Sequence, residues 1–342
     1  MSPAKVYKIA NVMLRLVIIG ATIWYLYEQL FAREKLDVLV EDIRDWRDFE
    51  PVMAFWIAAL LLMPVNLWLE TLKWRFLVDK LEKLKLNKAF TAVLSGISVS
   101  MFMPNRVGDY LGRVFILEKG NPVKGVLITM IGSLAQLLVT MLMGGLALLF
   151  YLPKVTLFAE PLPDLFFAGI VVLVFVLLVA GVLLFFNINL VYVITKKLFP
   201  KKGPVLLPYV EVFNYYNHKQ LAVVLGLSVL RYLVFSFQFI LFLWAFKLSI
   251  VYIDAFILVA LSYLLITLIP TVALSELGVR GSVSVYLFSA WYAAQQLDTI
   301  GLNTSVFAAS TAVWVVNIAF PALLGVFFVY RLKFFRRQNG KR

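Results

Sequence analysis

Long apolar stretches alternate with short charged segments along the chain, and this pattern predicts an all-α polytopic membrane protein. A helix of about 20 apolar residues is long enough to cross the hydrocarbon core of a bilayer. Six stretches have about this length and are predicted to span the membrane: residues 12–31, 51–69, 126–151, 165–186, 220–246 and 303–330.

The first of these stretches has a second interpretation, a cleaved signal peptide. Trp24, Tyr25 and Tyr27 occupy the place where the small residues of a cleavage site would lie, so we interpret the stretch as a retained span. Residues 33–50 follow with seven acids and four bases, and their apolar residues fall at helical spacing. This segment suits a helix lying in the membrane interface, and a solvated connector is the alternative.

Two further apolar stretches, residues 89–103 and 255–269, are too short to cross the bilayer comfortably. Each begins with Ala-Phe, is followed by a proline 15 positions after that alanine, and leads into charged residues. A helix that stops part-way and turns on polar residues is typical of a re-entrant hairpin, so we expect two hairpins 166 residues apart. The matching positions are Pro104 and Pro270, Gly112 and Gly278, and Arg113 and Arg280.

The distribution of positive charge favours hairpins over complete crossings. If both hairpins return to the side from which they enter, the cytoplasmic regions are the N-terminal segment, residues 70–88, the base of the first hairpin, residues 188–219 and the C-terminal tail. These regions carry 24 of the 32 lysines and arginines but only six of the 19 acids, as the positive-inside rule requires. A complete crossing by residues 89–103 would place the lysines of residues 196–202 outside. We therefore expect both termini to be cytoplasmic.

Three spans separate the two hairpins, so the second hairpin is expected to enter from the opposite face. The chain then forms a single membrane domain, residues 1–342, built from two inverted repeats, residues 12–151 and 165–330. Each repeat has the order span, span, hairpin, span. Discontinuous helices that meet near the midplane are typical of transporters, and backbone that is not helical at that depth is buried in protein or lines a wet cavity.

Composition supports the membrane assignment and narrows the chemistry. Hydrophobic residues make up 62% of the chain, against roughly 45–50% in soluble domains. The net charge of +13 would suggest nucleic-acid binding in a soluble protein, but the predicted topology accounts for it, so we expect no nucleic-acid partner. The chain has no cysteine, no Asp-x-Asp motif and a single histidine, His218. We therefore expect no catalytic residue, no metal and no cofactor, and the protein is not expected to be an enzyme.

Charged residues within the apolar regions are the candidates for a binding site, because isolated intramembrane charges are costly and mark functional positions. Arginines beside the N-termini of half-helices would suit the phosphate of an anionic head group. The alternative is that Asp109–Arg113 and Glu276–Arg280, spaced i,i+4, only pair with each other and hold the turns. Arg106 and Arg231 have no evident local acid. The candidates are Arg106, Asp109, Arg113, Arg231, Glu276 and Arg280.

Three motifs carry a resemblance to a known family. They are N-x-x-x-E-x-x-K-W-R (Asn66, Glu70, Lys73, Trp74 and Arg75), the stretch PNRVGDYLGR, and P-x(4)-SELGVRG. Together they resemble the membrane region of lysylphosphatidylglycerol synthases, the flippase-like integral membrane family, over essentially the whole chain. The resemblance adds Asn66, Glu70 and Arg75 to the substrate-binding candidates. The alternative for that motif is a membrane-surface role, with Trp74 as an interface anchor and the basic side chains snorkelling to water.

The resemblance implies a lipid flippase of a bacterial cytoplasmic (inner) membrane, whose partner is an anionic phospholipid or a lipid-linked intermediate. In bifunctional members such a region moves an aminoacylated phosphatidylglycerol between leaflets, and a separate soluble domain makes the lipid. This chain continues only twelve residues beyond Tyr330, so we expect no synthetase domain and no lipid aminoacylation. The alternatives are a membrane enzyme or enzyme subunit that handles polyprenyl-phosphate sugars, and a helper that recruits a protein partner.

The chain departs from the family pattern in both hairpin motifs. The first motif usually reads Pro-Gly-x-x-Gly-Glu, whereas this chain has Asn105-Arg106 followed by Asp109. The second motif usually places Glu after Gly-Val, whereas this chain has Arg280 there and Glu276 upstream. These changes alter the chemistry offered to a substrate while leaving the predicted fold intact.

The hairpin topology predicts opposite accessibility for the two turns. Single cysteines at residues 104–109 should react with an impermeant thiol reagent from the cytoplasmic side only, and cysteines at residues 274–280 from the outside only. The cysteine-free chain provides the unlabelled background. Equal labelling of both turns from the same side would contradict the inverted arrangement.

Overall fold

The computed structural model describes residues 49–101, 103, 107–118, 120–155, 163–199, 203–269 and 273–329, together with Met13 and Gly20. Several predictions fall outside these residues: the span at 12–31, the interface helix up to residue 48, the two turns at 104–106 and 270–272, and the C-terminal tail.

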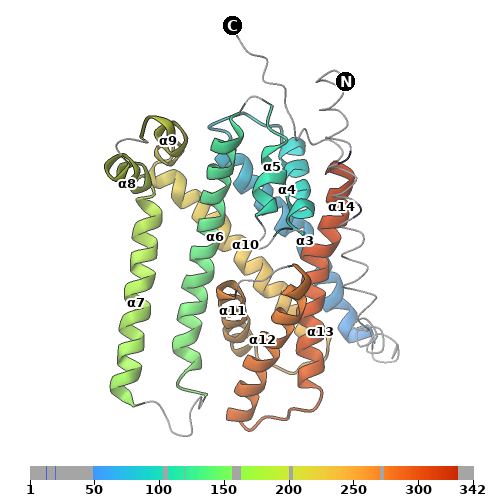
Figure 1. Cartoon of the computed structure of the whole chain (residues 1–342). Helices are drawn as coiled ribbons and strands as arrows, with labels where there is room; N and C mark the ends of the chain where they lie inside the picture. Colours follow the sequence, from blue (N-terminus) through green and yellow to red (C-terminus); the bar gives the residue numbers. More distant parts are fainter. Residues whose placement is uncertain are drawn as a thin grey trace.

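Every regular element in the described part of the chain is helical. Five helices are long and apolar enough to cross a membrane, and they correspond to five of the six predicted spans. The chain is therefore an all-helical integral membrane protein (Figure 1). The helices are α3 (Phe49–Val78), α4 (Leu86–Ser100), α5 (Gly108–Val114), α6 (Pro122–Tyr151), α7 (Asp164–Phe186), α8 (Leu190–Leu198), α9 (Gly203–Val210), α10 (His218–Ala245), α11 (Tyr252–Leu268), α12 (Ala273–Ala294), α13 (Leu302–Trp314) and α14 (Phe320–Val329), with a 3₁₀ turn η3 (Glu211–Asn214) and a π-helical turn η4 (Val315–Ala319).

Helix α3 extends nine residues beyond the predicted end of its span. The alternative in which Trp74 is an interface anchor and Lys73 snorkels to water does not fit the surroundings of Glu70, Lys73 and Trp74. All three are buried in the protein, with only 1% of Trp74 exposed. The indole Nε1 of Trp74 donates to the Thr129 hydroxyl at 3.0 Å, and Lys73 pairs with Glu70. These polar groups therefore find their partners inside the protein.

Helices α3 and α10 pack along each other with opposite chain directions, and both slope through the centre of the molecule (Figure 1). Near one end of the contact, Gln238 Nε2 donates to the Ala59 carbonyl at 2.7 Å. Seven residues away on each helix, Arg231 Nε donates to Asn66 Oδ1 at 2.8 Å. The residue numbers rise on α3 as they fall on α10, so the pair is antiparallel.

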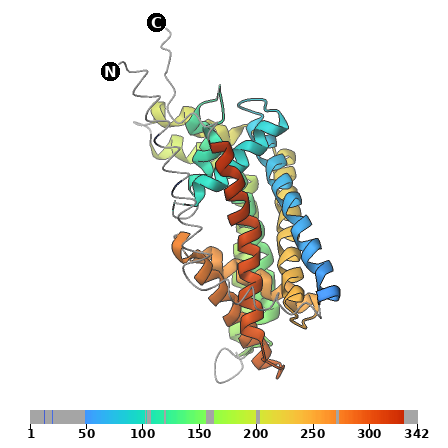
Figure 2. The same ribbon diagram turned by 90° about the vertical axis from the view of Figure 1, so that its right-hand side faces the viewer.

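Two helix pairs occupy opposite ends of the molecule. Helices α4 and α5 lie together in the upper half of Figure 1, and α11 and α12 lie together in the lower half; the turned view agrees (Figure 2). By helical rise, the 15 residues of α4 extend about 22 Å and the 17 residues of α11 about 26 Å. Both lengths fall short of a hydrocarbon core of about 30 Å.

Helices α4 and α5 approach closely because glycines face each other at their contact. A Cβ on Gly112 would lie 2.6 Å from the Cα of Gly96, and a Cβ on Gly108 would collide with the Val99 carbonyl. Helix α14 lies against the other side of α4, where the Ser98 hydroxyl donates to the Ala322 carbonyl. This glycine contact brings Asp109 and Arg113 of α5 next to the body of α4.

Helix α7 forms the outer edge of the molecule, beside α6 (Figure 1). Phe185 is its only buried residue; Val174 and Leu178 are half-buried at Gly145 of α6, and many of the other apolar side chains of α7 are exposed. An apolar helix with this exposure suits contact with lipid tails.

The glycine contact between α4 and α5 should be sensitive to a single methyl group. We expect Gly112→Ala to lower the free energy of unfolding by about 1–3 kcal/mol, because the added Cβ meets backbone that cannot move aside. Gly226 of α10 is the matched control, since a Cβ there meets nothing within 4 Å. Gly226→Ala should raise stability by about 0.5–1 kcal/mol. Unfolding in detergent followed by circular dichroism measures both, and equal effects would contradict the packing argument.

Candidate functional site

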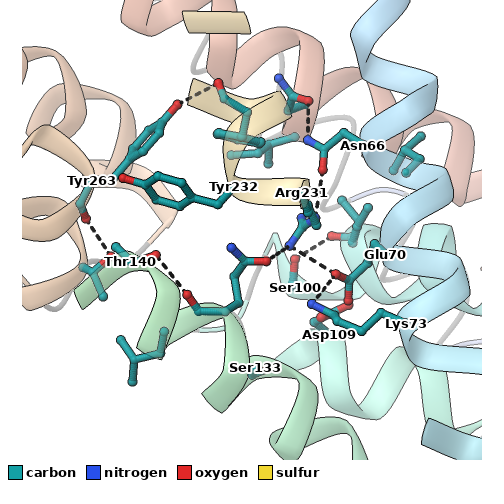
Figure 3. Close-up of a pocket in the computed structure, with 18 of the residues that line it drawn as sticks. Asn66, Glu70, Lys73, Ser100, Asp109, Ser133, Thr140, Arg231, Tyr232 and Tyr263 are labelled. Atoms are coloured by element: carbon teal, nitrogen blue, oxygen red, sulfur yellow. Dashed lines mark hydrogen bonds and ion pairs between the residues drawn. The ribbon is translucent and has the colours of Figure 1, made fainter. Parts of the chain in front are cut away.

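A polar cavity of about 360 Å³ lies at the centre of the helix bundle (Figure 3). Its lining comes from both helix pairs, from the long helices α3, α6 and α10, and from the π-helical turn η4. Six of the nine predicted site residues line it: Asn66, Glu70, Asp109, Arg113, Arg231 and Arg280. Residues far apart in the sequence therefore converge on one site.

The carboxylate of Glu70 is the meeting point of three cations. Lys73 Nζ lies 2.8 Å from Glu70 Oε2, and Arg231 NH1 lies 3.1 Å from the same oxygen. Arg113 NH1 contacts the other oxygen, Oε1, at 2.6 Å. A buried carboxylate is stable only when opposite charges and hydrogen bonds replace its water.

Arg113 binds two carboxylates, Asp109 of its own helix and Glu70 of α3, and the second joins α5 to α3. Its Nε and NH2 contact the two oxygens of Asp109 at 2.7 and 2.6 Å, which is a bidentate arrangement, and its NH1 reaches Glu70. The predicted i,i+4 pair therefore exists. The sequence did not indicate that Arg113 also binds an acid 43 residues earlier in the chain.

Arg231 is the most accessible of the three cations around Glu70. Its side chain is 28% exposed, against 6% for Arg113 and 3% for Lys73. Asn66 accepts from its Nε, and Gln136 Oε1 accepts from its NH1 at 3.3 Å. The sequence showed no local acid for Arg231, because its acid, Glu70, comes from another helix.

Neutral amides extend this network away from Arg231. Asn66 Nδ2 donates to Asn317 Oδ1 at 2.9 Å, and Asn317 Nδ2 donates to Gln238 Oε1 at 2.7 Å. Asn317 lies in the π-helical turn η4, and such turns are frequent at functional sites. The network holds the side chain of Asn66, and through it the guanidinium of Arg231.

The second helix pair contributes Arg280, whose Nε donates to Glu276 Oε1 at 3.0 Å. This is the predicted i,i+4 pair of the second turn. Arg280 lines the cavity. Glu276 does not line it but pairs with Arg280. The cavity thus receives a charged residue from each pair, Arg113 from the first and Arg280 from the second.

Two other predicted site residues lie elsewhere or cannot be placed. Arg75 is not among the residues that line the cavity, and its Nε donates to the Leu84 carbonyl at 3.0 Å. That bond fixes the turn after α3. Arg106 lies outside the described residues.

Sequence reasoning missed several polar residues of the cavity because they carry no charge. The available signal was polarity within an apolar stretch: Gln136 falls inside the predicted span at 126–151 and Asn317 inside the span at 303–330. Lys73 was noticed only as part of the family motif. The structure adds these lining residues to the predicted set: Lys73, Ser100, Ser133, Gln136, Thr140, Tyr232, Tyr263, Thr267 and Asn317.

The charges around Glu70 leave the site positive. Three cations, Lys73, Arg113 and Arg231, face the two carboxylates of Glu70 and Asp109. Lys73 and Arg113 are buried against these carboxylates, so the positive charge that faces the cavity is mainly that of Arg231. An arginine whose side chain is partly exposed at such a cavity suits an anion, above all a phosphate or carboxylate. Within the described residues no cluster of three or more His, Cys, Asp or Glu could hold a metal.

The long apolar helices and the cavity between them place this chain in the class of polytopic helical membrane proteins. Comparison with family models makes the assignment specific. The chain belongs to the family described as the lysylphosphatidylglycerol synthase TM region, whose model matches residues 12–309. The resemblance seen in the sequence motifs is therefore confirmed, and it indicates a function related to membrane lipids. Searches of curated proteins and of solved structures found no match.

Glu70 should contribute strongly to stability, because its carboxylate compensates the charge of three cations. We expect Glu70→Gln to lower the free energy of unfolding by about 3–5 kcal/mol, the usual cost of breaking a buried ion pair. The control is Glu211→Gln, since Glu211 is 53% exposed and lies 3.8 Å from Lys124. That change should have an effect below about 1 kcal/mol. Denaturation in detergent measures both variants, and a Glu70→Gln protein as stable as its control would refute the role of Glu70.

Proposed function

We propose that the protein is a lipid flippase that binds the phosphate of an anionic lipid head group in the central cavity and moves the lipid between leaflets. The observation that carries this proposal is the geometry of Arg231. Its guanidinium is held by Asn66, Gln136 and Glu70, and its side chain remains 28% exposed at a cavity of about 360 Å³. A preorganised arginine binds a phosphate without paying again to order its side chain.

The walls of the cavity suit an amphipathic ligand. Apolar lining residues, among them Leu137, Phe235 and Ile266, lie in the same cavity as the charged cluster. A lipid offers the matching combination, a charged head group joined to apolar chains. This mixture supports a lipid better than it supports a small water-soluble anion.

The positions of the two helix pairs support a transport mechanism. We propose that α4–α5 and α11–α12 are re-entrant hairpins entering from opposite faces, and that residues 12–151 and 165–330 are inverted repeats. The shortness of α4 and α11, the places of the two pairs at opposite ends of the molecule and the antiparallel packing of α3 on α10 support this arrangement. In such a design the site lies between the repeats, where either face can be opened in turn.

We propose a bacterial cytoplasmic membrane as the location, with both termini in the cytoplasm. The support is the charge distribution of the sequence together with α8, whose last turn carries Lys196 and Lys197. Helix α8 lies at the same end of the molecule as α4 and α5 (Figure 1). The positive-inside rule makes that end cytoplasmic. We propose transport without a chemical step, and conversion of a polyprenyl-phosphate sugar by the purified protein would favour the alternative of an enzyme.

Arg231→Gln tests the proposal, because glutamine keeps hydrogen bonding but removes the charge. In proteoliposomes with a fluorescent anionic phospholipid, we expect the rate of transfer between leaflets to fall at least about tenfold in the variant. A fall of about tenfold corresponds to the loss of one charged hydrogen bond. The control is Lys196→Gln with Lys197→Gln, which removes two exposed charges outside the cavity and should leave the rate near that of the parent. Equal rates for the Arg231 variant and the parent would refute the central site.

A further inference from the structure

The aliphatic hydroxyl groups that line the cavity share one property. Each of the four aliphatic hydroxyls donates its proton to a carbonyl of its own helix. Ser100 donates to Ile97 at 2.7 Å and Ser133 to Thr129 at 3.4 Å. The other two follow the same pattern: Thr140 donates to Gln136 at 3.0 Å and Thr267 to Tyr263 at 2.7 Å.

A hydroxyl whose O–H already donates a hydrogen bond can only accept further hydrogen bonds. Its oxygen carries one O–H and two lone pairs, so what remains available to a ligand is acceptor capacity. The Tyr263 hydroxyl is used in the same way, since it donates to the Phe235 carbonyl at 3.3 Å. Tyr232 differs, because its buried hydroxyl has no hydrogen-bond partner among the described residues.

The amide groups of the cavity also donate within the protein: Asn317 uses both of its N–H groups, and Asn66 and Gln136 use one each. Asn66 donates to Asn317, Gln136 donates to the Ser228 carbonyl at 3.4 Å, and Asn317 donates to Gln238 and to the Val313 carbonyl. Besides the arginines, the lining keeps a second N–H on Asn66 and on Gln136 and the hydroxyl of Tyr110 as donors, whereas its aliphatic hydroxyls offer only acceptor capacity. The cavity offers a cation at Arg231 and acceptors on the surrounding walls.

The acceptors are arranged along one face of α6 beside Arg231. Ser133, Gln136 and Thr140 are spaced three and four residues apart and lie on one side of that helix. Gln136 binds Arg231 directly, and Thr140 lies about one turn further along, a rise of about 6 Å. A phosphate at Arg231 and the end of a two- or three-carbon head group would bridge such a distance.

We propose that the cavity selects lipids whose phosphodiester head group carries hydrogen-bond donors, either hydroxyl or ammonium, and that Ser133, Thr140 and Thr267 set this selectivity. The inference rests on the proposed function, because it takes Arg231 as the phosphate site. A head group without donors, such as a methyl ester or a trimethylammonium, would leave the acceptors of the wall dehydrated and unpaired, and that costs binding free energy.

Two matched pairs of lipids test the selectivity with the full chain in nanodiscs. Phosphatidylglycerol and phosphatidylmethanol are both monoanions, and only the first carries donors. Phosphatidylethanolamine and phosphatidylcholine are both zwitterions, and only the first has N–H donors. With equal acyl chains, we expect native mass spectrometry to show binding of the donor-bearing lipid to be about fivefold tighter in each pair, which corresponds to about one hydrogen bond.

The variants Thr140→Val and Thr267→Val keep the shape of the side chain and remove the acceptor. Combined with Ser133→Ala, they should bring both lipid ratios to about one while leaving binding of phosphatidylmethanol unchanged. Thr195→Val is the matched control: Thr195 donates to the Val191 carbonyl at 2.7 Å in the same way, but it lies on the exposed helix α8 outside the cavity. Its lipid ratios should equal those of the parent.

The outcomes separate the two proposals. If binding depends on Arg231 but each lipid pair binds equally, the selectivity inference is refuted and the proposed function stands. If the ratios persist in the triple variant, selectivity arises elsewhere and the assigned residues are wrong. If Arg231→Gln changes the binding of none of the four lipids, the phosphate site is refuted, and the selectivity inference is refuted with it.

Discussion

The pairing of Glu70 with three cations is the interaction on which the rest of the site depends. An isolated charge inside a membrane protein is costly, and two cations close together are more costly still. Glu70 lies 2.6–3.1 Å from Lys73, Arg113 and Arg231, which belong to α3, α5 and α10. Because the carboxylate compensates all three, these helices are held together at one point, and Arg231 can remain charged while partly open to the cavity.

Around Glu70, both close helix packing and neutral hydrogen bonds hold the charged side chains in place. Glycines 96, 108 and 112 let α5 approach α4 closely enough to bring Arg113 to Glu70. The amides of Asn66, Asn317 and Gln238 connect α3, η4 and α10 without adding charge. Rigid packing holds the cluster from one side, and the cavity with its hydroxyl wall lies on the other.

The chain combines a family membership with a site whose chemistry differs from the usual family motifs. Arg280 occupies a position where the family usually has a glutamate, and it pairs with Glu276 one turn earlier. Family membership is retained over residues 12–309, and under the proposed function these altered positions would lie close to the head group. The site combines the positive charge of Arg231 with hydroxyl acceptors on the cavity wall. A ligand that suits it carries both an anionic group and hydrogen-bond donors.

The sequence by itself determined the class of protein, because about 20 apolar residues in a row have few stable alternatives to a membrane helix. It also identified the charged residues worth considering, since Asp109, Arg113, Arg231 and Arg280 stand out in apolar surroundings. Only the tertiary structure decided which charges meet. Glu70 and Arg231 are 161 residues apart in the chain, and no spacing rule pairs side chains of different helices. The neutral Gln136 and Asn317 were missed for the same reason: an amide shows its role only through its partners, and those partners lie on other helices.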